Sequence, residues 1–112
     1  MTARVDALAE AHTLSPDEVS ELVGRGEEDL AWADAIVRGI SREDGREVYL
    51  VVEVSWSLGV GDVERAARRA KILGKLGVRA LPVVAGKEIA EEADSAAREM
   101  GIYRVIDGKL LS

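Results

Sequence analysis

The segment 47–56 (Glu-Val-Tyr-Leu-Val-Val-Glu-Val-Ser-Trp) constrains the fold of this chain more than any other part of the sequence. It is rich in valine and aromatic residues, which favours a largely buried β-strand. Glu53 lies inside this apolar run. A carboxylate in such a strand is costly unless its face of the sheet is hydrated or the carboxylate has a partner. The segment therefore predicts a central strand that carries one polar site.

Patterns on either side of this strand predict alternating helices and strands. Ser15-Pro16-Asp17-Glu18 has the residues of a helix start, with Ser15 as N-cap and Glu18 placed to close a capping box. This order of elements predicts an α/β fold with a mixed β-sheet and flanking helices. The predicted helices cover 2–12, 16–24, 62–76 and 87–100, and the predicted strands cover 30–39, 47–56, 78–85 and 102–106.

The link between the first two predicted strands contains Asp44-Gly45, a favoured two-residue hairpin turn. In that register Asp34 and Glu53 are diagonal neighbours on one face of the sheet, roughly 7–8 Å apart at Cα. Two carboxylates at this spacing can share a hard cation such as Mg²⁺ or Mn²⁺. The alternative is that they only solubilise a hydrated face, and the spacing alone leaves both open. The opposite face, which includes Val48 and Leu50, is predicted to lie under a helix.

The composition limits the chemistry that is open to the chain. Its 112 residues suffice for one modest core, and they include no cysteine and one histidine, His12. Disulfides, thiolate zinc sites and multi-histidine sites are therefore excluded, and any metal must be held by oxygen. No apolar run is long enough to cross a bilayer and no signal peptide is recognisable, which predicts a cytoplasmic protein without a membrane partner. The absence of asparagine and glutamine is typical of thermophile proteins, although a GC-rich genome shifts the composition in the same direction.

The charge is unevenly distributed along the chain. A net charge of −6 argues against a protein that holds nucleic acid by bulk electrostatics. Residues 62–79 nevertheless carry six basic groups, which places a local basic surface on the predicted helix 62–76. Such a helix suits the backbone of a nucleic acid, although an exposed basic helix face that is merely solvated gives the same pattern.

Asp34, followed nineteen residues later by Glu53-Val54-Ser55 in a hydrophobic strand and then by a basic helix, resembles the PD-(D/E)XK nuclease superfamily. The resemblance covers about residues 16–106 and implies a restriction-endonuclease-like fold that cleaves phosphodiesters. It implies that Asp34 and Glu53 bind Mg²⁺ or Mn²⁺. It also divides the chain into a nuclease-like α/β domain, 15–112, and an N-terminal helix, 1–14, that can serve as an oligomerisation arm.

Ser55 stands where the family has a lysine that helps to position or activate water. A hydroxyl carries no positive charge and does not perturb a bound water as an ammonium group would. Some members take a basic group from the following helix, for which Arg65, Arg69 and Lys71 are candidates. The resemblance thus implies a degenerate nuclease-like domain that acts as a binding or assembly module and forms homo-oligomers. An active metal-dependent endonuclease and a structural domain without metal are the alternatives.

Overall fold

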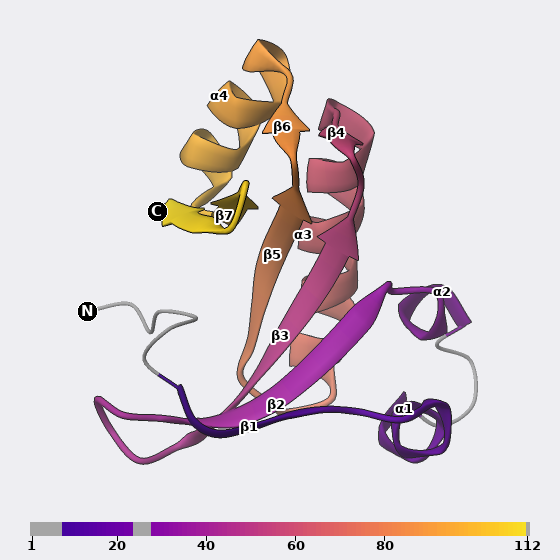
Figure 1. Ribbon diagram of the computed structural model, residues 1–112. Coiled ribbons are helices and arrows are strands. Elements are labelled where there is room, and N and C mark those ends of the chain that lie inside the picture. The colour runs from indigo at the N-terminus through magenta and orange to yellow at the C-terminus, as the bar shows by residue number, and fades with distance from the viewer. Residues whose placement is uncertain (1–7, 24–27, 112) are drawn as a thin grey trace.

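The computed structural model describes residues 8–23 and 28–111 of the chain, and a six-stranded sheet forms its centre (Figure 1). The sheet has the order β1-β2-β3-β5-β7-β8. Its strands are β1 Leu8–Thr13, β2 Ala35–Ser41, β3 Glu47–Val54, β5 Ala80–Gly86, β7 Tyr103–Ile106 and β8 Lys109–Leu111. The helices are α1 Pro16–Val23, α2 Glu28–Ala31, α3 Val60–Lys75 and α4 Glu91–Met100. A separate strand pair joins β4 Ser57–Leu58 to β6 Glu88–Ile89.

The sheet is mixed. The pairs β1–β2 and β2–β3 are antiparallel, the pairs β3–β5 and β5–β7 are parallel, and β8 turns back antiparallel to β7. The parallel pairs require crossovers, and α3 and α4 supply them. The predicted α/β class with a mixed sheet and flanking helices is therefore confirmed. Within the described residues, no helix is long and apolar enough to span a membrane.

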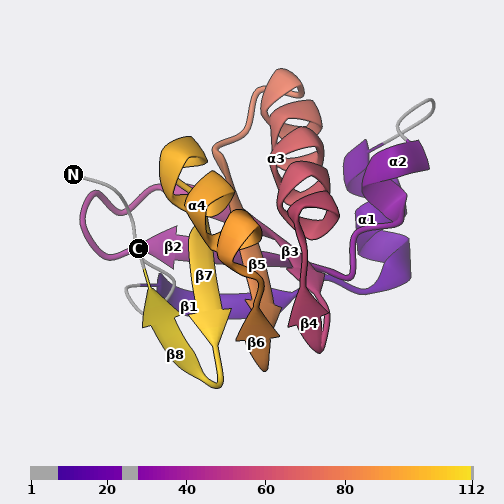
Figure 2. The same cartoon turned by 90° about the horizontal axis from the view of Figure 1, so that it is seen from above.

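The helices pack against one face of the sheet, as Figure 2 shows for α3 and α4. Tyr49 and Val51 of β3 form a core cluster with Ala70 and Leu73 of α3. Val48 and Leu50 point to the other face, where they cluster with residues of β5 and β7. The prediction that Val48 and Leu50 lie under a helix is thus wrong, because α3 covers the alternate residues of β3, which include Glu53.

Two short local features fix the start of α1 and the turn after β7. At the start of α1 the Ser15 hydroxyl accepts from the Glu18 N–H at 3.2 Å, and the Glu18 carboxylate accepts from the Ser15 N–H at 3.0 Å. This reciprocal pair is the capping box that the sequence predicts. Asp107 and Gly108 both have positive φ, 51° and 79°, as the tight turn between β7 and β8 requires.

The N-terminal segment differs from its prediction. The helix predicted over 2–12 is wrong in the part that the structure describes, because residues 8–13 form β1 and pair with β2. Residues 1–7 lie outside the described residues. An isolated helix this short has little stability in water, whereas the edge of β2 offers this segment backbone hydrogen-bond partners if it is extended. The role of 1–14 as an oligomerisation arm stays a prediction.

Two other boundaries also shift. The strand predicted over 30–39 begins only at Ala35, because residues 28–31 form the short helix α2. The helix predicted over 87–100 begins only at Glu91, because β6 precedes it and pairs with β4. In both cases a contact with a distant segment overrides the local pattern.

The hairpin between β2 and β3 is longer than predicted. Ala35 pairs with Val52, and the last ladder pair before the turn is Ile40 with Glu47. The Ser41 N–H then donates to the Arg46 carbonyl at 2.8 Å. The observed β2–β3 register therefore differs by two residues from the register that a two-residue Asp44-Gly45 turn would give. Since side chains alternate with period two, this displacement leaves each side chain of β3 on its predicted side relative to β2.

Candidate functional site

Glu53 lies near the end of β3 and points under α3, where only 2% of its surface is exposed. Its Oε1 accepts a hydrogen bond from Arg69 Nη1 at 2.7 Å. A second guanidinium, that of Arg65, approaches the same oxygen at 3.6 Å. The other oxygen, Oε2, is buried and has no hydrogen-bond partner among the described residues. The carboxylate on the central strand is thus paired with arginines from the helix above it.

Arg69 holds three segments of the chain together. Only 7% of its surface is exposed, and its Nη1 also donates to the carbonyl of Trp32 at 3.2 Å. Its Nη2 donates to Asp29 Oδ1 at 3.3 Å, and Arg68 Nε binds the other oxygen of Asp29 at 2.8 Å. These hydrogen bonds, first that from Arg68, hold the pKa of Asp29 below its ordinary value. These hydrogen bonds therefore attach helix α2 and the loop after it to α3.

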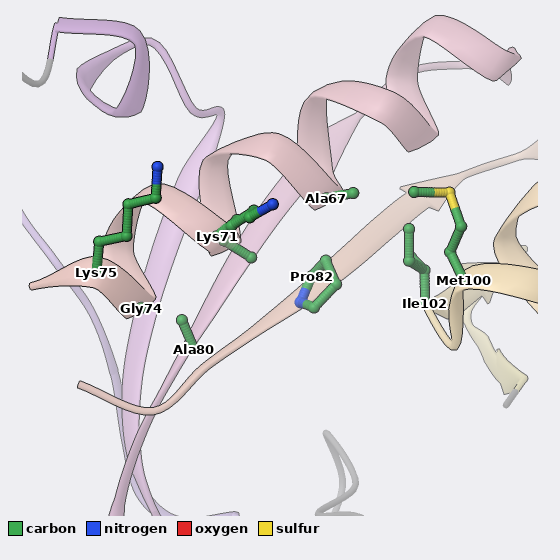
Figure 3. Close-up of a pocket in the computed structure, with 9 residues that line it drawn as sticks. Ala67, Lys71, Gly74, Lys75, Ala80, Pro82, Met100 and Ile102 are labelled. Carbon is green, nitrogen blue, oxygen red and sulfur yellow. The ribbon is translucent and has the colours of Figure 1, made fainter. Parts of the chain in front are cut away.

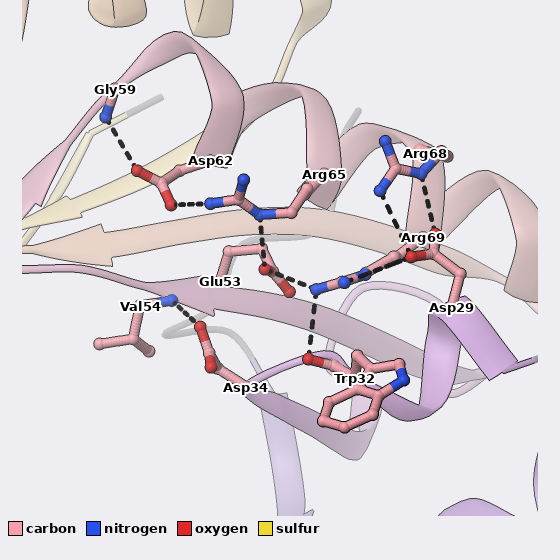
Figure 4. A network of polar contacts seen from close by, with 10 residues as sticks. All are labelled: Asp29, Trp32, Asp34, Glu53, Val54, Gly59, Asp62, Arg65, Arg68 and Arg69. Atoms are coloured by element: carbon pink, nitrogen blue, oxygen red, sulfur yellow. Dashed lines mark hydrogen bonds and ion pairs between the residues drawn. The ribbon is translucent and has the colours of Figure 1, made fainter.

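The first turn of α3 extends the same network. Asp62 Oδ2 accepts from the Gly59 N–H at 2.9 Å and so caps the helix, while its Oδ1 binds Arg65. Arg65 thereby bridges Asp62 and Glu53. We call this network the acid–arginine cluster, and Figure 4 shows its members. Its three carboxylates and three guanidiniums balance in charge, and they belong to Asp29, Glu53, Asp62, Arg65, Arg68 and Arg69.

Asp34 and Ser55 lie beside this cluster and bind the backbone. Asp34 immediately precedes β2, and its Oδ2 accepts from the Val54 N–H at 2.7 Å (Figure 4). The Ser55 hydroxyl donates to the Ser57 carbonyl at 3.1 Å. Neither side chain has a hydrogen bond to Glu53. The structure thus places Asp34 next to the strand that carries Glu53, while Ser55 stabilises the bend that follows it.

The donor set determines how well these residues suit a divalent cation. Within residues 8–23 and 28–111, no group of three histidine, cysteine, aspartate or glutamate side chains is arranged to hold a metal. Glu53 Oε1 is occupied by Arg69, and two guanidiniums would repel a cation placed at this carboxylate. The unpartnered Oε2 is the one feature that favours a cation. As arranged, the site suits internal ion pairing better than Mg²⁺ or Mn²⁺, and metal binding by Asp34 and Glu53 stays a prediction.

The three basic candidates of α3 have different positions. Arg65 and Arg69 contact Glu53, as a helix-borne basic group would need to. Lys71 instead lines a groove between α3, β5 and the end of α4 (Figure 3), and it forms no ion pair with Glu53. Asp29 was not anticipated at all. It lies 40 residues from Arg69 in the sequence, so no local pattern signals their contact.

Two tryptophans near the cluster are unusually exposed. Trp32 is 76% exposed and Trp56 is 73% exposed, although both are large apolar side chains. Trp32 lies two residues before Asp34 and Trp56 two residues after Val54, and the Asp34–Val54 hydrogen bond joins these segments. Large exposed aromatic side chains are typical of surfaces that bind partners.

Comparison with known proteins gives little further information. A scan of protein-family models and a search of curated proteins both find no match. A solved structure described as a repair endonuclease from Pyrococcus abyssi is similar over 86% of this chain, with 17% sequence identity and a TM-score of 0.49. The chain spans 48% of the length of that structure, about half.

Proposed function

We propose that this chain is a degenerate nuclease-like domain that binds a partner and does not cleave it. The observation that carries the proposal is the buried ion pair between Glu53 and Arg69, at 2.7 Å. Glu53 occupies the position at which the resemblance implies a metal-binding carboxylate, and Arg69 supplies the positive charge that a metal would otherwise bring. Ser55 supplies no ammonium group in place of the family lysine.

The partner that we propose is single-stranded nucleic acid, bound at Trp32 and Trp56. Indole rings stack on unpaired bases of any sequence, and this attraction depends less on charge than contact with the phosphates does. Base stacking is compatible with the net charge of −6 of this chain. Binding of the nucleic-acid phosphate backbone along α3 is less compatible with that charge. Arg68 and Arg69 are engaged by Asp29 and Glu53, which leaves the helix less positive than its sequence suggests.

The loss of cleavage is tested by incubating the chain with single- and double-stranded DNA and RNA in the presence of Mn²⁺. The matched control is the double variant Asp34→Ala/Glu53→Ala. We expect the two proteins to give the same background, and calorimetric titration with Mn²⁺ to give no heat that depends on these carboxylates. Cleavage by the original chain that disappears in the double variant would overturn the proposal in favour of an active nuclease. A gain of cleavage in Ser55→Lys would identify the missing lysine as the cause.

Binding is tested separately by tryptophan fluorescence during titration with a single-stranded oligonucleotide. We expect quenching, and we expect Trp32→Ala and Trp56→Ala each to weaken binding by about 1–3 kcal/mol, or roughly 5- to 150-fold. Tyr103→Phe is the matched control, because Tyr103 is a buried aromatic on a distant strand. Absence of quenching, or equal affinity in all variants, would contradict a stacking surface at these residues.

A further inference from the structure

The outer surface of α3 and α4 combines a groove with two charged stripes of opposite sign. The groove has a volume of about 520 Å³, and its floor is formed by small apolar residues such as Ala67 and Pro82 (Figure 3). Met100 borders it and is 50% exposed. An exposed methionine beside an apolar floor is typical of a surface that is covered in an assembly.

The basic stripe belongs to α3. Lys71 and Lys75 lie one turn apart on the helix and line the groove opposite Met100 (Figure 3). Neither lysine forms an ion pair within the part of the chain that the structure describes. They differ in this from Arg65, Arg68 and Arg69 on the same helix.

The acidic stripe belongs to α4. Glu91, Glu92 and Glu99 are exposed and surround a shallow hollow together with Ser95 and Ala96. Among the described residues these glutamates have no ion-pair partner either, whereas Asp94 on the same helix binds Arg98 and Arg104. Helices α3 and α4 are neighbours on one face of the sheet (Figure 2), and residues of both enter one core cluster, so the two stripes belong to adjacent helices.

We propose that this α3–α4 surface binds the same surface of a second copy of the chain, related by a two-fold axis. A two-fold contact is self-complementary, so the lysines of each copy can meet the glutamates of the other and form both sets of ion pairs at once. The small floor residues allow close approach, and Met100 supplies apolar contact at the centre. An unrelated acidic peptide would pair with the lysines alone and leave the glutamate stripe unused.

The area of this surface determines the dimer affinity that we expect. Helix α3 has 16 residues and α4 has 10, and two such helices packed together present a face on the order of 500 Å². Stable complexes bury about 800 Å² per partner, so we expect a weak, concentration-dependent dimer. Because its ion pairs are exposed at the rim, raising the salt concentration will weaken it. The inference does not depend on the acid–arginine cluster or on nucleic-acid binding.

Charge-reversal variants test the proposed lysine–glutamate ion pairs between the two copies, with dimerisation measured by analytical ultracentrifugation at low salt. We expect Lys71→Glu/Lys75→Glu and Glu92→Lys/Glu99→Lys each to raise the dissociation constant about tenfold or more, because like charges then face one another. An equimolar mixture of the two variants should dimerise again, since each lysine pair then meets a glutamate pair. Arg42→Glu/Lys109→Glu, which reverses two exposed charges elsewhere, is the matched control and should dimerise as the original chain does.

Each alternative result is decisive. A chain that is monomeric at all concentrations, or a dimer that charge reversal leaves unchanged, would overturn the proposal. Failure of the mixed variants to associate would also overturn it, provided that thermal unfolding shows both variants to be folded. Whether the chain cleaves or binds nucleic acid has no bearing on this result, so the two proposals can fail separately.

Discussion

Replacing Arg69 by methionine is the most direct test of the acid–arginine cluster. Methionine keeps much of the volume of the arginine stem but removes the guanidinium that contacts Glu53, Asp29 and the Trp32 carbonyl. Glu53 would remain buried, with Arg65 at 3.6 Å as its nearest cation. Breaking one side of a buried ion pair costs about 3–5 kcal/mol, because the remaining charge has lost its compensation.

We therefore expect Arg69→Met to lower the free energy of unfolding by about 3–5 kcal/mol, measured by urea denaturation. In a domain of this size that loss corresponds to a melting temperature lower by about 12–20 °C. Arg98→Met is the control on α4, because the Arg98–Asp94 pair is a surface ion pair, with 69% of the arginine side chain exposed. Such pairs contribute about 0–1 kcal/mol.

The double variant Arg69→Met/Glu53→Leu separates a buried charge from simple loss of packing. Replacing both members of a buried ion pair by apolar residues is often neutral or stabilising, so we expect most of the lost stability to return. A cost below about 1 kcal/mol for Arg69→Met would refute the reasoning. A double variant no more stable than Arg69→Met would refute it as well, because the unpaired Glu53 charge would then not be the cause.

Two further predictions concern other parts of the fold. A Cβ at Gly86 would lie 2.2 Å from the Ser55 carbonyl oxygen, so Gly86→Ala should cost about 1–3 kcal/mol or more in urea denaturation; unchanged stability would contradict this close approach. The Ser15 N–H, with help from His12, lowers the pKa of Glu18 from 4.5 to about 2. Because this pKa is depressed in the folded state, the stabilisation is present above about pH 4.5 and is lost as the pH falls toward 2. Acid titration followed by circular dichroism should show this loss in the original chain and not in Glu18→Gln; identical curves would exclude the capping carboxylate as the cause.

Part of the candidate site could be predicted from sequence. The apolar strand with a carboxylate at Glu53 and the basic character of α3 follow from residues that are neighbours in the chain. Of the three basic candidates on this helix, Arg65 and Arg69 contact Glu53 and Lys71 does not, and their functional role stays a prediction. The contacts of Asp29 with Arg68 and Arg69 could not be anticipated, because they join segments about 40 residues apart. Whether a carboxylate faces water, a metal or a guanidinium depends on which helix covers the sheet.

The sequence alone determined the elements whose cause is local. Period-two alternation defines β3, helical spacing defines α3, and the Ser15–Glu18 capping box begins α1, since each depends on residues a few positions apart. The tertiary structure decided that residues 8–13 form a strand, that the β2–β3 register shifts by two, and that α3 covers the Glu53 face. Those outcomes depend on backbone partners and packing surfaces that only distant segments supply. The free energy of these long-range contacts exceeds the small local helix and strand preferences on which the sequence-based predictions depended.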